Sequence, residues 1–266
     1  MLRLMTRDDY TFIFIGGLHR SGTSLFARCM IDHPAASGFH DTGVPEDEGQ
    51  HLQTVFPPAR TFGGPGVFGF AEAMHVTEES ALVSEVNRGR LWDEWSAHWD
   101  VGRSHLIEKS PPNLIKARFL QAMFPNAHFI FLLRHPIAVA AATRKWARRT
   151  PLGKLLEHWA VCHEIMREDL GHLDRAMVIH YEEFVDQPHR ILDTAFQFVG
   201  LSPIETQREI RRTVNDAYFA QWDTWAKAFF AGRSIRQAES RLESRLNEFG
   251  YSVKDPFRQM QSPFKI

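Results

Sequence analysis

The sequence has little cysteine, almost no net charge and no uncharged apolar run long enough for a membrane-spanning helix. Cys29 and Cys162 are far apart and both fall in segments with helical periodicity, so we expect two free, buried thiols in a reducing compartment rather than a disulfide. The net charge of -1 offers no overall cationic field to a nucleic-acid backbone. Residues 1–9 carry charges where a signal peptide needs its apolar stretch. These absences predict a cytoplasmic protein that neither binds nucleic acid nor spans a membrane.

The chain of 266 residues alternates between short apolar runs and segments of helical periodicity. This alternation predicts an α/β fold, a P-loop-like parallel sheet flanked by helices, over residues 11–200, with a helical C-terminal part at 204–266 in a single domain 1–266. We expect strands at 12–15, 36–39, 105–108, 127–133 and 177–180, and helices at 78–87, 90–99, 113–123, 153–168, 188–199 and over most of 204–249. Residues 42–70 are rich in Gly and Pro and read as a long lid or binding loop.

The segment from Thr11 to Ser24 is the most informative part of the chain. An apolar run is followed by Gly16 and Gly17 and then by Ser21-Gly22-Thr23-Ser24, which opens a helix. A strand, a glycine turn and a helix N-terminus bring backbone N–H groups to one point, and such a point binds anions. The frame Gly17-x4-Gly22-x-Ser24 matches a nucleotide P-loop, except that Thr23 stands at the position of the P-loop lysine.

Other polar side chains follow the remaining predicted strands. In parallel sheets ligands bind beyond the carboxyl ends of the strands, so we expect these side chains to meet at one edge. Lysine and arginine then arrive there from three strands, which predicts a pocket for a ligand with several negative charges. The segments concerned are Arg20–Ser24, His40-Asp41, Lys109-Ser110, Arg134 and Tyr181-Glu182.

The kind of phosphate chemistry depends on the missing lysine. A P-loop kinase also needs a Walker-B aspartate near Mg²⁺, and only Glu108 could take that place here. The cation of the loop instead comes earlier, at Arg20. Such a loop can hold a 5′-phosphate without a metal, although a P-loop nucleotide kinase or phosphotransferase remains an alternative.

Gly17-Leu-His-Arg-Ser-Gly-Thr-Ser24 resembles the 5′-phosphosulfate loop of the sulfotransferases that use 3′-phosphoadenosine 5′-phosphosulfate (PAPS), in the form typical of bacterial members. Four more segments are similar to segments of that family, the last of them to tyrosylprotein-type members. They are Glu108-Lys-Ser-Pro-Pro112, Phe124 to Pro136, His180-Tyr-Glu-Glu-Phe184 with 198–201, and Phe249-Gly-Tyr-Ser252. The resemblance implies a sulfotransferase that moves a sulfuryl group from PAPS to a hydroxyl or amine acceptor and requires no metal.

The resemblance also implies roles for individual residues. Lys109 would face the transferred sulfuryl group and, with Arg20, stabilise the leaving oxygen. Arg134 would bind the 3′-phosphate of the cofactor, and Tyr181 would lie near its adenine. The 5′-phosphosulfate would be held by the loop residues His19, Arg20, Ser21, Gly22, Thr23 and Ser24.

One position departs from the family pattern. The family commonly has a serine eight residues after the 3′-phosphate arginine, and here that residue is Ala142. Thr143 is adjacent but lies further round a helix, and Arg144, Lys145, Arg233 or Arg236 are candidates to compensate. The departure leaves a third interpretation, a non-catalytic nucleotide-binding protein.

Sulfuryl transfer to a hydroxyl needs a base. Asp47-Glu48-Gly49-Gln50 resembles the acidic pair of heparan-type sulfotransferases, which makes Glu48 the first candidate. In tyrosylprotein-type members the base position maps onto Asp41, with His40 beside it, and a third possibility is that none of these is the base. The sequence does not identify the acceptor, and a small molecule, a carbohydrate or a peptide would each fit.

Overall fold

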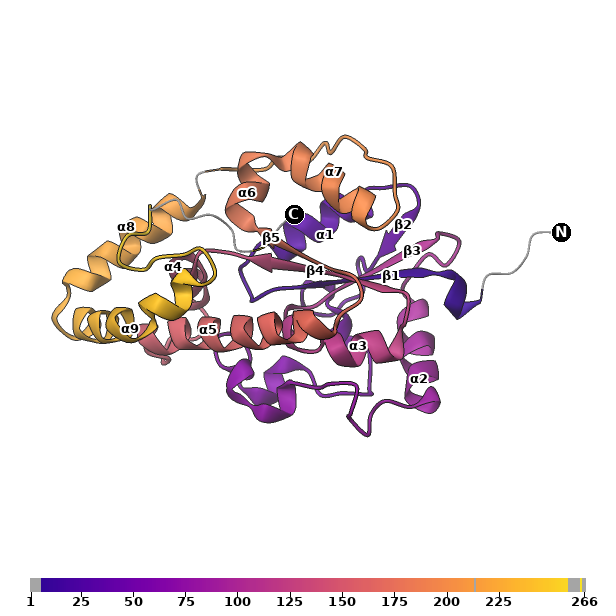
Figure 1. Cartoon of the computed structure of the whole chain (residues 1–266), viewed down its shortest axis with the longest axis horizontal. Helices are drawn as coiled ribbons and strands as arrows, with labels where there is room; N and C mark the ends of the chain where they lie inside the picture. Colours follow the sequence, from indigo (N-terminus) through magenta and orange to yellow (C-terminus); the bar gives the residue numbers. More distant parts are fainter. Residues whose placement is uncertain (1–5, 213, 258–263, 265–266) are drawn as a thin grey trace.

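The computed structural model describes residues 6–212, 214–257 and 264, and its centre is a five-stranded parallel sheet (Figure 1). The strands are β1 (Thr11–Gly16), β2 (Ala36–Gly38), β3 (His105–Lys109), β4 (Ala127–Leu133) and β5 (Ala176–His180). Their order is β2-β3-β1-β4-β5, so the chain moves to opposite sides of β1 and creates a switch point at its carboxyl end. All five predicted strands are confirmed within one or two residues.

Both faces of the sheet are covered by helices, since successive residues of β1 point to opposite sides and all four from Phe12 to Ile15 are apolar and buried. Ile13 and Ile15 pack under the layer formed by α1 (Thr23–Ile31), α6 (Tyr181–Asp186) and α7 (Pro188–Phe198). Phe12 and Phe14 pack on the other layer, which contains α2 (Glu85–Ser96), α3 (Ala117–Met123) and α5 (Leu152–Asp169). Figure 1 shows the two layers on either side of the strands. The α/β prediction is confirmed.

Three helix predictions before β4 differ from the structure. The helices expected at 78–87 and 90–99 are one helix, α2, because the Ser84 hydroxyl accepts a hydrogen bond from the Asn87 N–H and caps its start. The helix expected over 113–123 is a 3₁₀ turn, Pro111–Ile115, followed by α3, since two prolines occupy its first positions. Between β2 and α2 the chain forms only short 3₁₀ turns, in agreement with the predicted long loop.

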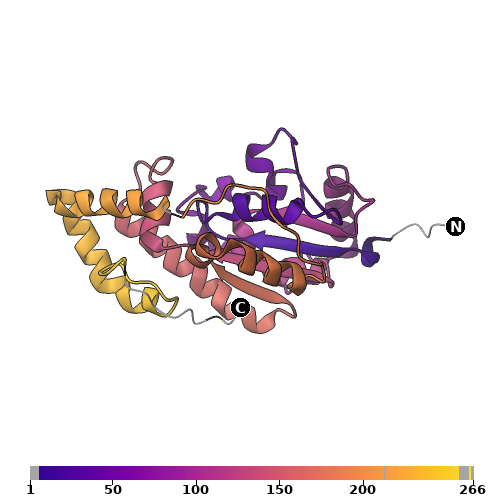
Figure 2. The same ribbon diagram turned by 90° about the horizontal axis from the view of Figure 1, so that it is seen from above.

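The C-terminal part contains α8 (Val214–Lys227) and α9 (Phe229–Asn247), which stand out at one end of the molecule (Figure 2). The stretch 202–212 before them is irregular, so the prediction of helix over most of 204–249 was too broad at its start. An ion pair joins α9 to α5 between Arg245 and Glu164. Residues 1–5, 213, 258–263 and 265–266, which belong to the predicted single domain, lie outside the described residues.

Three further findings bear on the predictions. Cys29 and Cys162 are free and buried, as expected. Among the described helices none is long and apolar enough to cross a membrane. The short helix α4 (Pro136–Thr143) follows β4 directly and is buried along its whole length. It therefore fixes the end of β4, where Arg134 lies, inside the molecule.

Candidate functional site

The sheet register brings the predicted cations to the two sides of the loop after β1. Lys109 is the last residue of β3 and pairs with Ile15 of β1. On the other side Gly16 pairs with Phe131 of β4, and Leu133 pairs with His180 of β5. Arg134 and Tyr181, the next residues along their strands, therefore lie beside each other, with the Arg134 guanidinium carbon 4.3 Å from the centre of the Tyr181 ring.

A cavity of about 280 Å³ lies at this edge of the sheet. The first turn of α1 forms part of its wall, and the first N–H groups of a helix have no partner within the helix. The site therefore combines helix N–H groups with guanidinium groups, a combination that binds phosphate-like anions. Of the predicted residues, those in its lining are His19, Arg20, Gly22, Thr23, Ser24, Glu48, Arg134 and Tyr181.

Gly22 is the residue that allows the loop to approach β5. Its φ of 92° lies in the left-handed region, and a Cβ there would come within 2.5 Å of the Tyr181 ring. Arg20 also has a positive φ, 73°, which turns its side chain into the cavity wall. Glycine at position 22 therefore permits the close contact with Tyr181, and Arg20 has a backbone conformation that residues with a Cβ rarely adopt.

Ser21 and His19 differ from the other residues of the loop in burial and in charge. The Ser21 side chain is fully buried, and its hydroxyl has no hydrogen-bond partner among the described residues. It does not line the cavity. His19 does line the cavity, but burial and the nearby Lys109 lower the pKa of its ring to about 3. His19 is therefore neutral at physiological pH.

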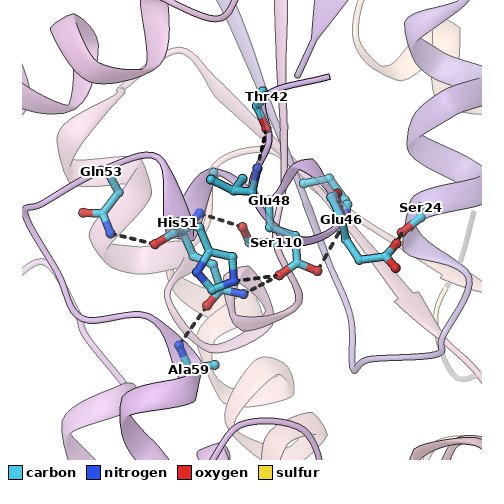
Figure 3. Close-up of polar contacts among 12 residues, drawn as sticks. Ser24, Thr42, Glu46, Glu48, His51, Gln53, Ala59 and Ser110 are labelled. Carbon is cyan, nitrogen blue, oxygen red and sulfur yellow. Dashed lines mark hydrogen bonds and ion pairs between the residues drawn. The ribbon is translucent and has the colours of Figure 1, made fainter. Parts of the chain in front are cut away.

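Glu48 lines the cavity, whereas Lys109 lies behind it, in the lining of a smaller neighbouring hollow that shares Ser24, Arg28 and Glu46 with the cavity. The Lys109 ammonium lies 3.4 Å from a carboxylate oxygen of Glu48 and donates a hydrogen bond to the carbonyl of Glu46 at 3.0 Å. Figure 3 shows the Glu48 carboxylate between the His51 ring and Glu46, with Ser24 beyond. Burial raises the pKa of Glu48, although Lys109 and a hydrogen bond from Gln50 favour the charged form. A carboxylate of this kind is suited to accept a proton.

The segment that carries Glu48 is attached to the end of β3. The backbone N–H of Gly49 donates to Glu108 at 2.9 Å, and that of Gln50 donates to the Ser110 hydroxyl at 3.0 Å. A Cβ on Gly49 would come within 2.5 Å of the Glu108 carboxylate, so only glycine permits this approach. These contacts join residues about 60 positions apart in the chain.

The carboxyl oxygens of Glu108 are occupied by hydrogen bonds that hold this segment. Its carboxyl accepts hydrogen bonds from Ser110, Asn113 and the Gly49 N–H, and only 1% of the residue is exposed. Burial raises its pKa to about 7, and the hydrogen bonds from Ser110 and Asn113 and the charge of Lys109 oppose that shift only in part. Glu108 is not in the cavity lining. It acts on the site by holding the Glu48 segment.

The alternative base residues lie elsewhere. The side chains of His40 and Asp41 are 77% and 88% exposed and pair with each other at 3.0 Å. Neither lines the cavity. The reason is the turn that follows them: Thr42 donates to the Asp47 carboxylate through both its N–H and its hydroxyl, which closes the loop and carries the chain on to Glu48.

A model of the sulfotransferase family matches residues 13–205, a span that includes most of β1, the loop after it and the other four strands. The chain belongs to the sulfotransferase family. It is 26% identical over 206 residues to a protein-tyrosine sulfotransferase of Drosophila melanogaster and 23% identical over 210 residues to protein-tyrosine sulfotransferase 2 of Gallus gallus. These matches cover 73% and 74% of this chain but only 38% and 53% of the relatives, so the chain matches about half or less of their length.

Solved sulfotransferases share the fold. Sulfotransferase STF1 from Mycobacterium tuberculosis H37Rv superposes with a TM-score of 0.51 at 14% identity, over 88% of this chain and 77% of that one. The sulfotransferase domain of the Synechococcus PCC 7002 olefin synthase gives a TM-score of 0.51 at 16% identity, over 91% and 98% of the two chains. At this identity the comparison establishes the P-loop-like fold alone.

The site of this sulfotransferase-family chain contains residues that the sequence did not single out. Trp146 is 56% exposed in the cavity lining, and the Arg20 guanidinium carbon lies 5.4 Å from its ring centre. Arg28 and Glu46 also line the cavity. Arg28 could have been found, because it is one helical turn after Ser24 on α1. Nothing in the sequence pointed to Asn215, whose amide bonds Arg134.

Proposed function

We propose that this chain transfers a sulfuryl group from PAPS to a hydroxyl or amine acceptor and releases adenosine 3′,5′-bisphosphate. One observation carries the proposal: the cavity combines the N-terminus of α1 and two arginines, Arg20 and Arg134, with the carboxylate of Glu48. The helix N-terminus and the arginines are suited to bind an anionic donor, and the Glu48 carboxylate is suited to remove a proton from an acceptor. Membership in the sulfotransferase family supports the same reaction class.

The proposed reaction is an in-line displacement. The acceptor oxygen forms a bond to sulfur while the bond between sulfur and the bridging oxygen of the 5′-phosphate breaks. Glu48 takes the acceptor proton, and Arg20 and Lys109 stabilise the negative charge that develops on the leaving oxygen. Thr23, Ser24 and the first N–H groups of α1 would hold the 5′-phosphate, and Arg134 would hold the 3′-phosphate.

Ligand binding tests the donor. We expect adenosine 3′,5′-bisphosphate to raise the thermal midpoint of the protein without added metal, since a ligand that binds only the folded state stabilises it. ATP with Mg²⁺ should give a smaller shift. Radiolabelled PAPS with a panel of acceptors should then give a labelled product. Stabilisation by ATP–Mg²⁺ but not by the bisphosphate would overturn the proposal.

The kinase alternative finds less support in the geometry. Glu108 is the one acidic residue that the sequence offered for Mg²⁺, and its two oxygens already accept hydrogen bonds from Ser110, Asn113 and Gly49. It is also outside the cavity lining. The non-catalytic alternative rests on Ala142, and it predicts binding of the bisphosphate without transfer of label to any acceptor.

The acceptor class is a separate part of the proposal. Relatives named protein-tyrosine sulfotransferases favour a peptide acceptor. The exposed ring of Trp146 beside Arg20 is suited to a flat or aromatic group. A carbohydrate or another small molecule stays a possible acceptor, and a tyrosine-containing peptide is the first compound to assay. The cytoplasmic location and the single domain over 1–266 remain predictions.

A further inference from the structure

Arg134 is a buried cation whose charge is not matched by a carboxylate. Only 4% of the residue is exposed, and it lines the cavity. Its Nε and Nη2 groups donate to Asn215 Oδ1 at 2.8 and 2.7 Å, and Nη1 donates to the carbonyl of Arg20 at 2.8 Å. In the described part of the chain no carboxylate forms an ion pair with it. A buried guanidinium without a counter-ion favours binding of an anion.

The carboxylate of Glu182 is separated from Arg134 by the side chain of Asn215, which bonds both. Glu182 Oε1 accepts hydrogen bonds from Asn215 Nδ2 at 2.7 Å and from the His135 N–H at 3.0 Å. Its other oxygen accepts one from the Tyr251 hydroxyl at 2.8 Å. The neutral amide of Asn215 therefore stands between Glu182 and Arg134, orienting the guanidinium without neutralising it.

The positions expected to assist Arg134 do not reach the cavity. Ala142 is buried and carries no polar group, and Thr143 lines a separate small hollow with Leu18 and Gly66. Arg144 donates to the carbonyls of Ala147 and Thr150. A guanidinium has five N–H groups, and three of those of Arg134 are used by Asn215 and Arg20.

We propose that Asn215 is a positioning residue that makes the site selective for a nucleotide with a 3′-phosphate. This inference rests on the proposed function. The amide fixes one edge of Arg134, keeps Glu182 from pairing with it, and leaves its two remaining N–H groups and its full charge for the 3′-phosphate. Asn215 lies at the start of α8, so the selectivity of the core depends on the C-terminal helices.

Calorimetric titration of the full chain with two nucleotides tests this role. Adenosine 3′,5′-bisphosphate has the 3′-phosphate, and adenosine 5′-monophosphate lacks it. Asn215→Ala removes the oxygen that accepts two hydrogen bonds from Arg134. We expect the bisphosphate to bind this variant about tenfold more weakly, because the guanidinium is no longer oriented toward the 3′-phosphate, while affinity for the monophosphate stays within about twofold. Asn215→Asp should weaken the bisphosphate further, because its carboxylate pairs with Arg134.

Asn126→Ala is the control for loss of an asparagine amide, because the Asn126 side chain is exposed, lies outside the cavity lining and donates a hydrogen bond to the Asp8 carbonyl. Both nucleotides should bind this variant as they bind the wild type. If both Asn215 variants bind the two nucleotides equally more weakly than the wild type, Asn215 only stabilises α8. If they bind the bisphosphate more tightly, the Asn215 oxygen competes with the ligand for Arg134. Either result overturns the inference. If the wild type does not prefer the bisphosphate, the proposed function itself fails.

Discussion

Glu48, in the cavity lining, pairs with Lys109, with 3.4 Å between the ammonium nitrogen and a carboxylate oxygen. Residues 49 and 50, next to Glu48, are tied to the end of β3, the strand that carries Lys109. One group is suited to accept a proton and the other to stabilise negative charge. Their pairing also keeps both side chains ordered in a place where each is less than a tenth exposed.

Glu48→Gln tests the base directly. We expect kcat to fall by about 10²- to 10⁴-fold, as for removal of a general base, while adenosine 3′,5′-bisphosphate binds with little change. Steady-state assays with labelled PAPS measure kcat, and calorimetric titration measures the affinity for the bisphosphate. Because burial raises the pKa of Glu48, the wild-type rate should rise with pH through a midpoint above that of an ordinary glutamate. The variant should lose this rise.

Asp41→Asn and His40→Ala are the controls for the base. Both residues are exposed and outside the cavity lining, so neither variant should change kcat by more than about twofold. A loss of kcat in Asp41→Asn with Glu48→Gln still active would assign the base to the earlier position.

Lys109→Met removes the cation that, in the proposed reaction, stabilises the leaving oxygen. Loss of one such contact should lower kcat by about 10²- to 10³-fold. It also leaves Glu48 without its nearest cation, so the acid limb of the pH–rate profile should move to higher pH in this variant. Lys154→Met is the control, since Lys154 pairs with the partly exposed Glu157 outside the site. If the acid limb of Lys109→Met stays at the wild-type pH, the pairing of Glu48 with Lys109 does not control the base.

Gly22→Ala tests the contact between the loop and Tyr181. The added Cβ would meet the Tyr181 ring at 2.5 Å in a backbone with φ of 92°. We expect lower thermal stability and loss of bisphosphate binding. Gly200→Ala isolates the backbone effect, because Gly200 has φ of 80° but nothing lies within 4 Å of the added atom. Its cost should be about 1–2 kcal/mol with binding retained. Equal behaviour of the two variants would argue against the contact.

Glu108 should make stability depend on pH. Its pKa is raised from 4.5 to about 7 in the folded state, so the folded protein binds more protons than the unfolded chain between these values. The free energy of unfolding should therefore fall as pH rises across this window, by up to about 3 kcal/mol from this group. Denaturant unfolding at several pH values should show a weaker fall in Glu108→Gln. Glu94→Gln, at a half-buried position whose carboxylate accepts hydrogen bonds from Thr54 outside the cavity lining, should keep the wild-type slope.

Much of the site could be predicted from residues that are close in sequence. The loop after β1 has its turn and helix start within Gly17–Ser24, and Lys109, Arg134 and Tyr181 each come directly at or after a strand. Parallel strands end at one edge, so their gathering follows from strand prediction alone. The base in the long loop was harder to predict, since the sequence allowed either His40-Asp41 or Glu48. The turn closed by Thr42 and Asp47 leaves His40 and Asp41 outside the cavity lining and carries the chain on to Glu48.

The fold class and the anion-binding loop after β1 could be predicted from the sequence, because strand periodicity, the glycines and the helix start are local signals. Tertiary structure decided which carboxylate meets Lys109 and which group holds Arg134. Glu48 and Lys109 are 61 residues apart, and Arg134 and Asn215 are 81 apart. Such pairings depend on how a long loop and a terminal helix pack against the sheet, and no local pattern encodes that packing.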